Sequence, residues 1–194
     1  YGELGQNNTT QFSSPVQIPG TSWSSISAAR QSLATKTDGT LWAWGRGSYG
    51  SLGDGTTANR SSPVQIGTLS TWSSISAGSN HGFAIKNDNT LWGWGRGTFG
   101  ELGDNTTVNK SSPVQIGSGY SVVSAGGYYT LAVKTDGTLW SWGYNNNYQL
   151  GDGTTTTQSS PIQIGTGFAT VFAGIDDGSV SYGTSLGIKS NGTL

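Results

Sequence analysis

The chain has 194 residues, of which 32 are glycine and 10% are charged, and its formal net charge is −1. Eight Trp, eight Tyr and five Phe argue against a disordered chain, because disordered segments have few aromatic residues and a high net charge. Without a basic stripe, nucleic acid is not expected as a partner. The absence of Cys excludes disulfides and thiolate metal sites, and no apolar run is long enough to predict membrane insertion.

The sequence consists of four copies of one unit. "SSPVQI" starts at residues 13, 61 and 111 and "SSPIQI" at 159, so the steps are 48, 50 and 48 residues. Self-similarity at this period is typical of propellers and solenoids. We therefore predict a single repeat array over 1–194, as part of a longer one. Its approximate units are residues 1–48, 49–98, 99–146 and 147–194.

Four kinds of short strand follow one another in each repeat. They are rich in Val, Ile, Trp and Phe and are bounded by Gly, Asn, Asp and Ser, which is a strand signal. In chain order the expected strands are 15–18, 23–28, 33–36, 41–45, 63–66, 72–77, 83–86, 91–95, 113–116, 120–125, 131–134, 139–143, 161–164, 168–173 and 186–189. No stretch has the apolar period of a helix.

Turn residues separate the second and third strands of each copy. Asp-Gly stands at 38–39 and 136–137, Asp-Asn at 88–89 and Asn-Gly at 191–192. Two-residue hairpins need a positive φ, which Gly adopts freely and Asn or Asp tolerates. Four-stranded antiparallel units at this period predict an all-β fold, a β-propeller of four-stranded blades that belongs to a larger ring of about seven blades.

The third strand carries the phrase "LWAWG" at 41–45, "LWGWG" at 91–95 and "LWSWG" at 139–143. Alternation along a strand places both Trp on one face and the small middle residue on the other. We interpret this as stacking of blades, with large residues against small ones of the neighbouring blade. The alternative is a sugar-stacking platform, but a binding platform is usually local rather than repeated in every unit.

A run at residues 75–107 resembles the repeat of the regulator of chromosome condensation family. The features that carry the resemblance are "AG" before the loop, His81, "LWGWG" and "GELG" at 100–103, and the likeness covers the whole chain. It implies a propeller, usually of about seven blades. Founding members are exchange factors for the GTPase Ran and bind nucleosomes through an inserted wedge and basic segments, neither of which is found here.

Two other branches of the family are relevant. One contains a secreted bacterial inhibitor of β-lactamase with an aromatic-rich propeller face. Another comprises regular, polar arrays in bacterial surface proteins and phage-borne proteins, and the near-identical copies with Ser/Thr/Asn-rich loops are most similar to this branch.

No catalytic constellation is visible, so we expect no enzyme activity and no cofactor. His81 is the single His and has no nucleophile-elbow context, which favours a structural role. Asp38, Asp88 and Asp136 share one repeat position and Asp54, Asp104 and Asp152 another, which favours turn capping over paired acid–base work. One carboxylate per loop is too few for a Ca²⁺ site.

The loop after the first strand differs most between copies, and we interpret such differences as recognition. The alternative is drift in exposed loops. All four loops should open on one side of the disc, and Tyr and Arg are common binding anchors. The predicted binding residues are Arg30, Asn80, His81, Tyr128, Tyr129, Asp176, Asp177 and Tyr182.

The sequence thus favours a non-enzymatic scaffold and recognition module that binds a protein or glycan through its loop face. Further repeats or another chain are expected to complete the ring. An extracellular, cell-surface or virion location is expected from the resemblance. One alternative function is a soluble protein inhibitor, as in the β-lactamase-inhibitor branch; another is a guanine-nucleotide exchange factor or chromatin binder.

Overall fold

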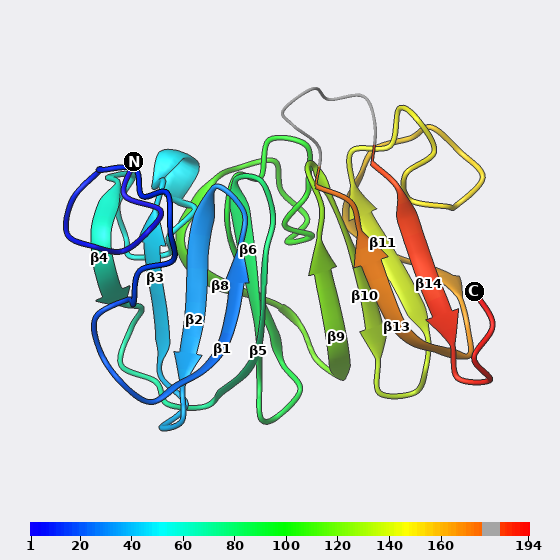
Figure 1. Ribbon diagram of the computed structural model, residues 1–194. Coiled ribbons are helices and arrows are strands. Elements are labelled where there is room, and N and C mark those ends of the chain that lie inside the picture. The colour runs from blue at the N-terminus through cyan, green and yellow to red at the C-terminus, as the bar shows by residue number, and fades with distance from the viewer. Residues whose placement is uncertain (176–182) are drawn as a thin grey trace.

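A computed structural model describes residues 1–175 and 183–194, and in these residues the chain forms strands grouped in four sheets. We name the sheets blades A to D in chain order (Figure 1). Blade A comprises β1 (Trp23–Ala28), β2 (Gln31–Lys36), β3 (Leu41–Gly45) and β4 (Arg60–Gln65). Blade B comprises β5 (Trp72–Ala77), β6 (His81–Lys86), β7 (Leu91–Gly95) and β8 (Lys110–Gly117).

Blade C comprises β9 (Tyr120–Ala125), β10 (Tyr129–Lys134), β11 (Leu139–Gly143) and β12 (Gln158–Gly165). Blade D comprises β13 (Phe168–Ala173) and β14 (Ser185–Lys189). A single 3₁₀ turn, η1 (Ser48–Gly50), follows β3 among the described residues. None of the helical structure in that part of the chain is long enough to cross a membrane.

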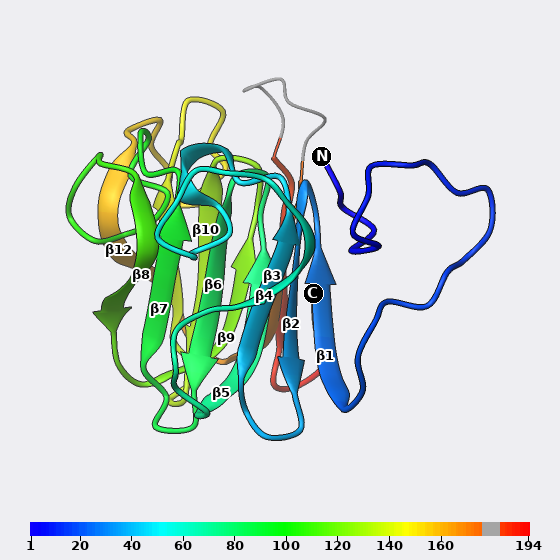
Figure 2. The same ribbon diagram turned by 90° about the vertical axis from the view of Figure 1, so that its left-hand side faces the viewer.

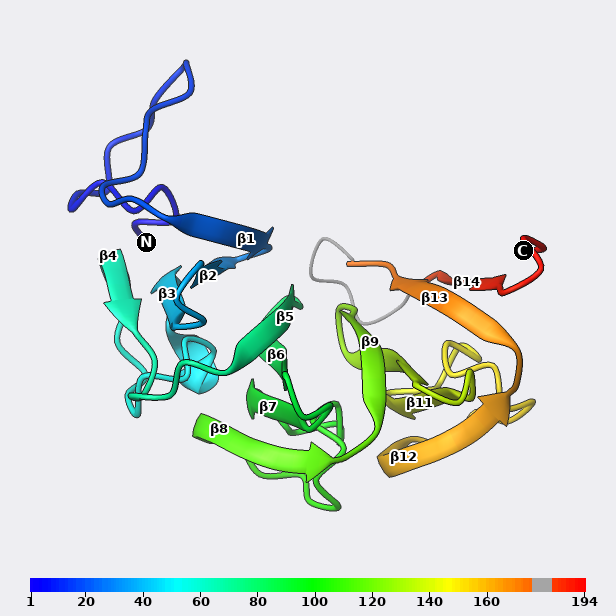
Figure 3. The same cartoon turned by 90° about the horizontal axis from the view of Figure 1, so that it is seen from below.

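The blades are antiparallel sheets whose strand order follows the sequence, and they stand side by side along an arc (Figure 3). The first strands β1, β5, β9 and β13 contact one another on the concave side, and β8 and β12 lie on the convex side. Seen from the side, the N-terminal segment extends away from blade A (Figure 2). The predicted all-β propeller architecture is therefore confirmed as part of a ring.

Each second-to-third-strand turn is held by the same set of polar groups. Asp38 Oδ1 accepts hydrogen bonds from the backbone N–H and the hydroxyl of Thr40, at 3.0 and 2.7 Å. Thr40 Oγ1 in turn accepts the indole N–H of Trp42 at 2.9 Å. These bonds hold the pKa of the Asp38 carboxyl below its ordinary value, the Thr40 hydroxyl being the largest cause. The turn residue Gly39 has a φ of +77°, as a hairpin of this kind requires.

Neighbouring blades share apolar cores and one repeated hydrogen bond. Leu33 of blade A is buried with Trp72 and Trp94 of blade B, and equivalent clusters join B to C and C to D. The hydroxyl of Ser27 accepts the backbone N–H of Ala77 at 2.9 Å, so the bond crosses from one inner strand to the next. The same bond recurs between Ser76 and Ala125 and between Ser124 and Ala173.

The second Trp of each third strand is the centre of this packing. Trp44, Trp94 and Trp142 are 0 to 1% exposed, which excludes an open sugar platform at these rings. Each indole N–H donates to a backbone carbonyl of the loop that carries the "LG" dipeptide. The three bonds are Trp44 to Glu3 O at 2.9 Å, Trp94 to Ser51 O at 3.0 Å and Trp142 to Glu101 O at 2.9 Å.

The small residue between the two Trp has a different role from the one expected. A Cβ at Gly93 would lie 2.6 Å from the ring of Phe83, its cross-strand partner in the same blade. The residue is therefore small to admit Phe83, which then reaches Trp142 of the next blade with ring centroids 6.0 Å apart. The first Trp of each pair is half-buried rather than buried, and a Lys lies over it. The Lys–Trp distances are 4.2 Å for Lys36–Trp42, 3.8 Å for Lys86–Trp92 and 4.2 Å for Lys134–Trp140.

One predicted strand is absent, and the second and fourth strands of the blades have other bounds than predicted. Residues 15–18 form no strand, because the fourth strand of a blade pairs with the third strand of the same blade, and residues 1–14 form no third strand. The second strand of blade B begins at His81 rather than Phe83, which places the ring of His81 in the sheet instead of in a loop.

Candidate functional site

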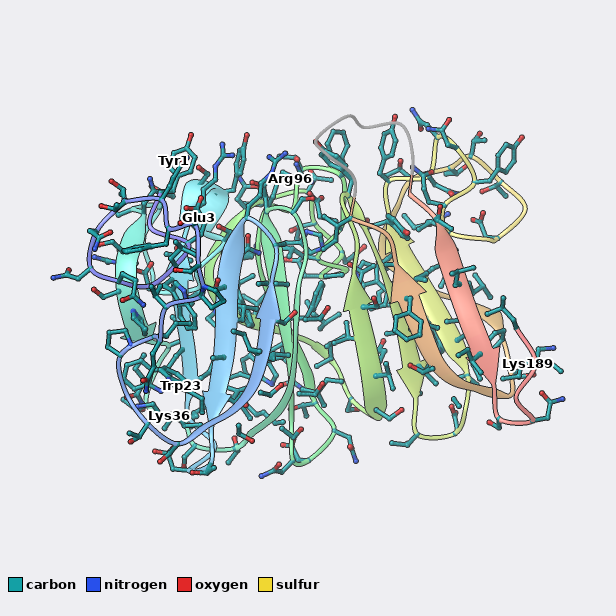
Figure 4. The ribbon with its side chains drawn as sticks, viewed as in Figure 1. Tyr1, Glu3, Trp23, Lys36, Arg96 and Lys189 are labelled. Carbon is teal, nitrogen blue, oxygen red and sulfur yellow. The ribbon has the colours of Figure 1, made fainter. Side chains whose placement is uncertain are left out.

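The loops after the first and third strands lie along one edge of the arc, at the top of Figure 1, and we refer to this edge as the upper face. Among the described residues it comprises 29–30, 46–59, 78–80, 96–109, 126–128 and 144–157. The side-chain view shows Tyr1 and Arg96 at this edge, whereas Lys36 and Lys189 lie toward the opposite edge (Figure 4). The upper face thus gathers the segments that differ most between the copies.

The structure separates the predicted binding residues into three groups. Arg30 and Tyr128 are partly exposed at the upper face. Asn80, His81 and Tyr129 are only 3%, 0% and 1% exposed, so they do not belong to an exposed binding surface, and that part of the prediction is wrong. Asp176, Asp177 and Tyr182 lie outside the described residues.

The buried residues among them connect one blade to the next. Gln31, His81 and Tyr129 each begin a second strand and so occupy one repeat position. Gln31 Nε2 donates to the carbonyls of Gly78 and His81 at 2.9 Å, and Tyr129 Oη donates to Thr184 O at 2.8 Å. Three different polar side chains at this position thus reach a group of the next blade.

His81 is unsuited to acid–base work. Burial, and then the nearby charge of Arg96, lowers its pKa to about 3, so the imidazole is neutral at physiological pH. Its Nε2 lies 3.4 Å from Thr130 Oγ1, and the hydroxyl proton of Thr130 is donated to Glu101 O at 2.9 Å. Nε2 therefore carries the imidazole proton and donates to Thr130.

A buried ion pair anchors the upper face between blades B and C. Arg96 Nε lies 2.5 Å from Glu101 Oε1, with side-chain exposures of 6% and 0%. Arg96 also donates to Gly127 O at 3.0 Å, and the second carboxylate oxygen of Glu101 accepts the N–H of Phe99 at 2.6 Å. Both charges are thus paired and hydrogen-bonded, as buried charges must be.

Three aromatic rings surround this ion pair. The guanidinium of Arg96 lies 3.8 Å from the ring centroid of Tyr128 and 5.7 Å from that of Phe99. Phe99 contacts Tyr128 and Tyr144 edge-on, with centroids 5.5 and 5.2 Å apart. Phe99, Tyr128 and Tyr144 are each partly exposed. We call Arg96, Phe99, Glu101, Tyr128 and Tyr144 the aromatic cluster.

Two further tyrosines lie on upper-face loops, Tyr49 after the third strand of blade A and Tyr148 after that of blade C. Tyr49 and Tyr148 are 45% and 62% exposed. Tyr49 shares its repeat position with Phe99, and Tyr148 shares its position with Gly50 and Gly100. Both tyrosines have left-handed backbone conformations, with φ of +63° and +62°. Such a conformation is unfavourable for a bulky residue, and at position 148 the turn requires it, because Gly50 and Gly100 at the same repeat position have φ of +80° and +72°.

The predicted binding residues did not include Arg96, Phe99, Glu101 and Tyr144, because they were taken from the loop after the first strand. A usable signal was present in the loop after the third strand. The repeat position of Arg96 is occupied by Arg46 and Tyr144 in other copies, and that of Glu101 by Glu3, Ser51 and Gln149.

The remaining carboxylates in the described part of the chain serve the loops. Asp54 pairs with Arg60 at 2.7 Å and Asp104 with Lys110 at 3.3 Å, which fixes each long loop to the following strand. No group of three or more His, Asp or Glu in residues 1–175 and 183–194 is close enough to hold a metal ion.

Two family models match the repeats. One model of the regulator of chromosome condensation (RCC1) repeat matches residues 38–85 and 136–176, and a second matches residues 72–101 and 114–149. Together they cover more than half of the chain. The chain belongs to the RCC1 repeat family. The resemblance of residues 75–107 is thereby confirmed, and the second-strand position of His81 is a blade-connecting position of this RCC1 array.

Solved structures agree on the fold of the RCC1 array. Prp20p from Saccharomyces cerevisiae, studied with its binding properties to Gsp1p and histones, superposes with a TM-score of 0.82 at 20% identity, over 96% of this chain and 50% of that one. Yeast RCC1 (Prp20) bound to Kap60 superposes with a TM-score of 0.81 at 21% identity, over 97% of this chain and 49% of that one. Human WBSCR16 superposes with a TM-score of 0.64 at 15% identity, over 90% of this chain and 64% of that one. The chain spans about half the length of the yeast proteins.

Proposed function

We propose that this RCC1 array is a non-enzymatic scaffold whose upper face binds a protein or a glycan through the aromatic cluster and the adjoining Tyr49 and Tyr148. The observation that carries this proposal is the aromatic cluster itself. It places partly exposed rings around a buried ion pair, and Tyr and Arg are among the residues that contribute most to binding energy at interfaces.

The electrostatics of the cluster favour an uncharged contact group on the partner. The charge of Arg96 is compensated by Glu101, and a further donor of its guanidinium is engaged by Gly127 O. The rings, rather than a net charge, are therefore available for contact. A sugar ring or an apolar side chain suits such a surface better than a phosphate does, which supports a protein or glycan over nucleic acid.

A non-enzymatic role is supported by the state of the titratable groups in the described residues. His81 is buried and neutral, and the recurring Asp side chains cap turns or pair with a cation of their own loop. The location that we propose for the module, a secreted, cell-surface or virion protein, rests on the polar, regular repeats.

The proposal is tested by binding measurements with upper-face variants. The labelled chain is applied to an array of neutral oligosaccharides, and a photoreactive residue at position 148 is used to crosslink protein partners in a whole-cell extract. Tyr148→Ser and Phe99→Ala should each reduce a genuine interaction about tenfold or more. Ser190→Ala, at an exposed position at the opposite edge, should leave it unchanged.

Retention of every interaction in Tyr148→Ser and Phe99→Ala, with unfolding midpoints showing folded proteins, would contradict this function. The rival role, exchange factor or chromatin binder, is suggested by yeast Prp20p and its binding to Gsp1p and histones. A nucleotide-release assay with a small GTPase is therefore a suitable counter-screen. Release that depends on this chain would favour an exchange factor instead.

A further inference from the structure

The turns between second and third strands meet the next blade at the lower edge of the arc, opposite the upper face (Figure 1). Each turn accepts one backbone hydrogen bond from the first residue of the following blade. The three bonds, 3.0 to 3.1 Å long, join Trp72 N–H to Gly39 O, Tyr120 N–H to Asn89 O and Phe168 N–H to Gly137 O. The second turn residue therefore has the same place at the three junctions of blades A to D, and its side chain affects how the space beside it is filled.

Two of the three junctions provide a group for this space. Between blades A and B the connecting loop is two residues longer than its counterparts, and a Cβ on Gly39 would lie 2.2 Å from Ser70 O of that loop. Between blades B and C the loop is short, but the turn residue is Asn89, whose φ of +62° directs its side chain to the same side. Between blades C and D the loop is short and the turn residue is Gly137, so neither a longer loop nor a side chain takes this place.

A hollow of about 480 Å³ lies at this junction, between blades C and D. A Cβ on Gly137 would be 3.6 Å from Phe168 O, which is an ordinary contact distance and leaves room beside the turn. Ser121 and Thr135, which carry hydroxyl groups, line the hollow, and Val133 and Phe168 add an apolar wall. The hollow thus combines apolar surface with a few polar groups, as binding sites for small molecules do.

Asp136 gives this hollow a negative charge. Its Oδ1 accepts the backbone N–H and the hydroxyl of Thr138, at 2.9 and 2.6 Å. These bonds hold the pKa of the Asp136 carboxyl below its ordinary value, the Thr138 hydroxyl being the largest cause. Lys134 also borders the hollow, but its ammonium lies 4.2 Å from the ring centroid of Trp140 and 5.1 Å from that of Tyr120, and both rings pack toward blade B. Oδ2 of Asp136 remains as a charged acceptor for a ligand.

The acceptors in the hollow favour a ligand whose donors are hydroxyl groups. The fork of a guanidinium needs two unoccupied carboxylate oxygens, whereas Oδ1 of Asp136 already accepts two bonds. An anionic group would be repelled by the Asp136 carboxylate. A sugar ring instead offers single O–H donors for Oδ2 and for the hydroxyls of Ser121 and Thr135, and its C–H groups suit the apolar wall.

We propose that the hollow between blades C and D is a second binding site, distinct from the upper face, for one neutral sugar ring. Asp136 Oδ2 accepts a hydroxyl of the ring, and Ser121 and Thr135 bind neighbouring hydroxyls. Gly137 leaves the volume that the ring occupies. At the other two junctions of the described chain the same place is taken by the longer loop or by an Asn side chain, so the site belongs to this junction.

The probes for this site are the methyl glycosides of glucose, galactose and mannose. Each is titrated into the isotope-labelled 194-residue chain, and binding is followed by the NMR shifts of backbone amides. Saturable shifts are expected at residues 135–138 and 167–169 with at least one glycoside, in the millimolar range that is ordinary for a single ring. Shifts at upper-face amides report on the other site and are fitted separately.

Two variants that copy other turns of this chain locate the binding. Gly137→Asn reproduces the Asp-Asn turn of blade B and places a side chain in the hollow, so the affinity should fall about tenfold or more. Asp136→Asn reproduces the Asn-Gly turn at 191–192, where Asn191 Oδ1 still accepts both bonds from Thr193. It removes the charge, and the affinity should fall about tenfold because hydrogen bonds to charged groups are the stronger ones. The reverse exchange Asn89→Gly, between blades B and C, should leave the affinity of this site unchanged.

The proposal fails if no glycoside shifts the amides of residues 135–138 and 167–169, or if folded Gly137→Asn and Asn89→Gly bind the sugar equally well. A larger response to butylammonium than to every glycoside would also overturn it, because the carboxylate would then select a cation. The upper-face variants Tyr148→Ser and Phe99→Ala do not alter the hollow. Sugar binding that survives in them but is lost in Gly137→Asn therefore supports this site even where the proposed function fails.

Discussion

At the scale of single residues, variation between copies has two different meanings. Gln31, His81 and Tyr129 differ in chemistry, yet all are buried and reach across to the next blade. Tyr49 is exposed at the surface, whereas Phe99 at the same repeat position is half-buried. The distinction depends on where the Cβ points, which the sequence pattern alone does not give for residues next to a loop.

Replacing His81 by Gln should flatten the dependence of stability on pH. The pKa of His81 is about 3 in the folded chain and near 6.5 in the unfolded chain, so the unfolded chain binds more protons between these values. Stability is therefore expected to fall as the pH is lowered from about 6.5, by at most about 1.4 kcal/mol per pH unit. Glutamine is the residue that blade A has at this repeat position, as Gln31, and it does not titrate.

Urea unfolding at about pH 7, 5.5 and 4.5 measures this difference, because the turn carboxylates with lowered pKa values lose their contribution only at lower pH. The wild-type chain should lose stability across this range and His81→Gln should lose much less. Parallel profiles for the two proteins would show that His81 is not buried in its neutral form.

At the scale of elements, the long loop after each third strand fastens one blade to the next. The loop of blade A supplies Ser51 O to Trp94, and that of blade B supplies Glu101 O to Trp142. The glycine that follows each loop's leucine allows the indole to lie flat on the backbone. The "LG" dipeptide, which marks the repeat in the sequence, is thus a packing requirement between blades.

Replacing Gly103 by Ala should destabilise the fold more than replacing Gly153 by Ala. Both glycines have a φ of +76°, so both variants bear the backbone cost of a left-handed Ala, about 1 to 2 kcal/mol. Only at Gly103 would the Cβ approach an indole, 2.7 Å from Trp142 Nε1, which adds an overpacking cost of about 1 to 3 kcal/mol. Equal unfolding free energies for the two variants would disprove the role of this contact.

At the scale of the whole molecule, the two ends of the arc are chemically unlike its interior. Ile26 on β1 is 63% exposed, whereas Val123 and Val171 at the same repeat position are 7% and 2% exposed against the preceding blade. Ile26 lines a groove of about 390 Å³ with Val16, Ile18 and Trp44. The blades are interchangeable in sequence, but their burial depends on whether a neighbour covers them.

Truncation at these two equivalent positions should therefore have unequal effects in the 194-residue chain. Val123→Ala is expected to cost about 1 to 2 kcal/mol, because it removes buried methyl groups from the core between blades B and C. Ile26→Ala removes more atoms but should cost less than about 0.5 kcal/mol. Chemical denaturation gives both values, and a cost at Ile26 as large as that at Val123 would indicate that another surface covers blade A in solution.

The sequence by itself determined the repeat, the strand types, the turns and the propeller class, because period, alternation and turn residues are local properties of the chain. It also predicted burial of the repeated Trp pairs, correctly for the second Trp of each pair. Tertiary structure alone decided that residues 15–18 form no strand and that Asn80, His81 and Tyr129 are buried. Tertiary structure also decided that Arg96 and Glu101 contact three aromatic rings. All of these outcomes depend on which blade packs against which, and the local sequence does not contain that information.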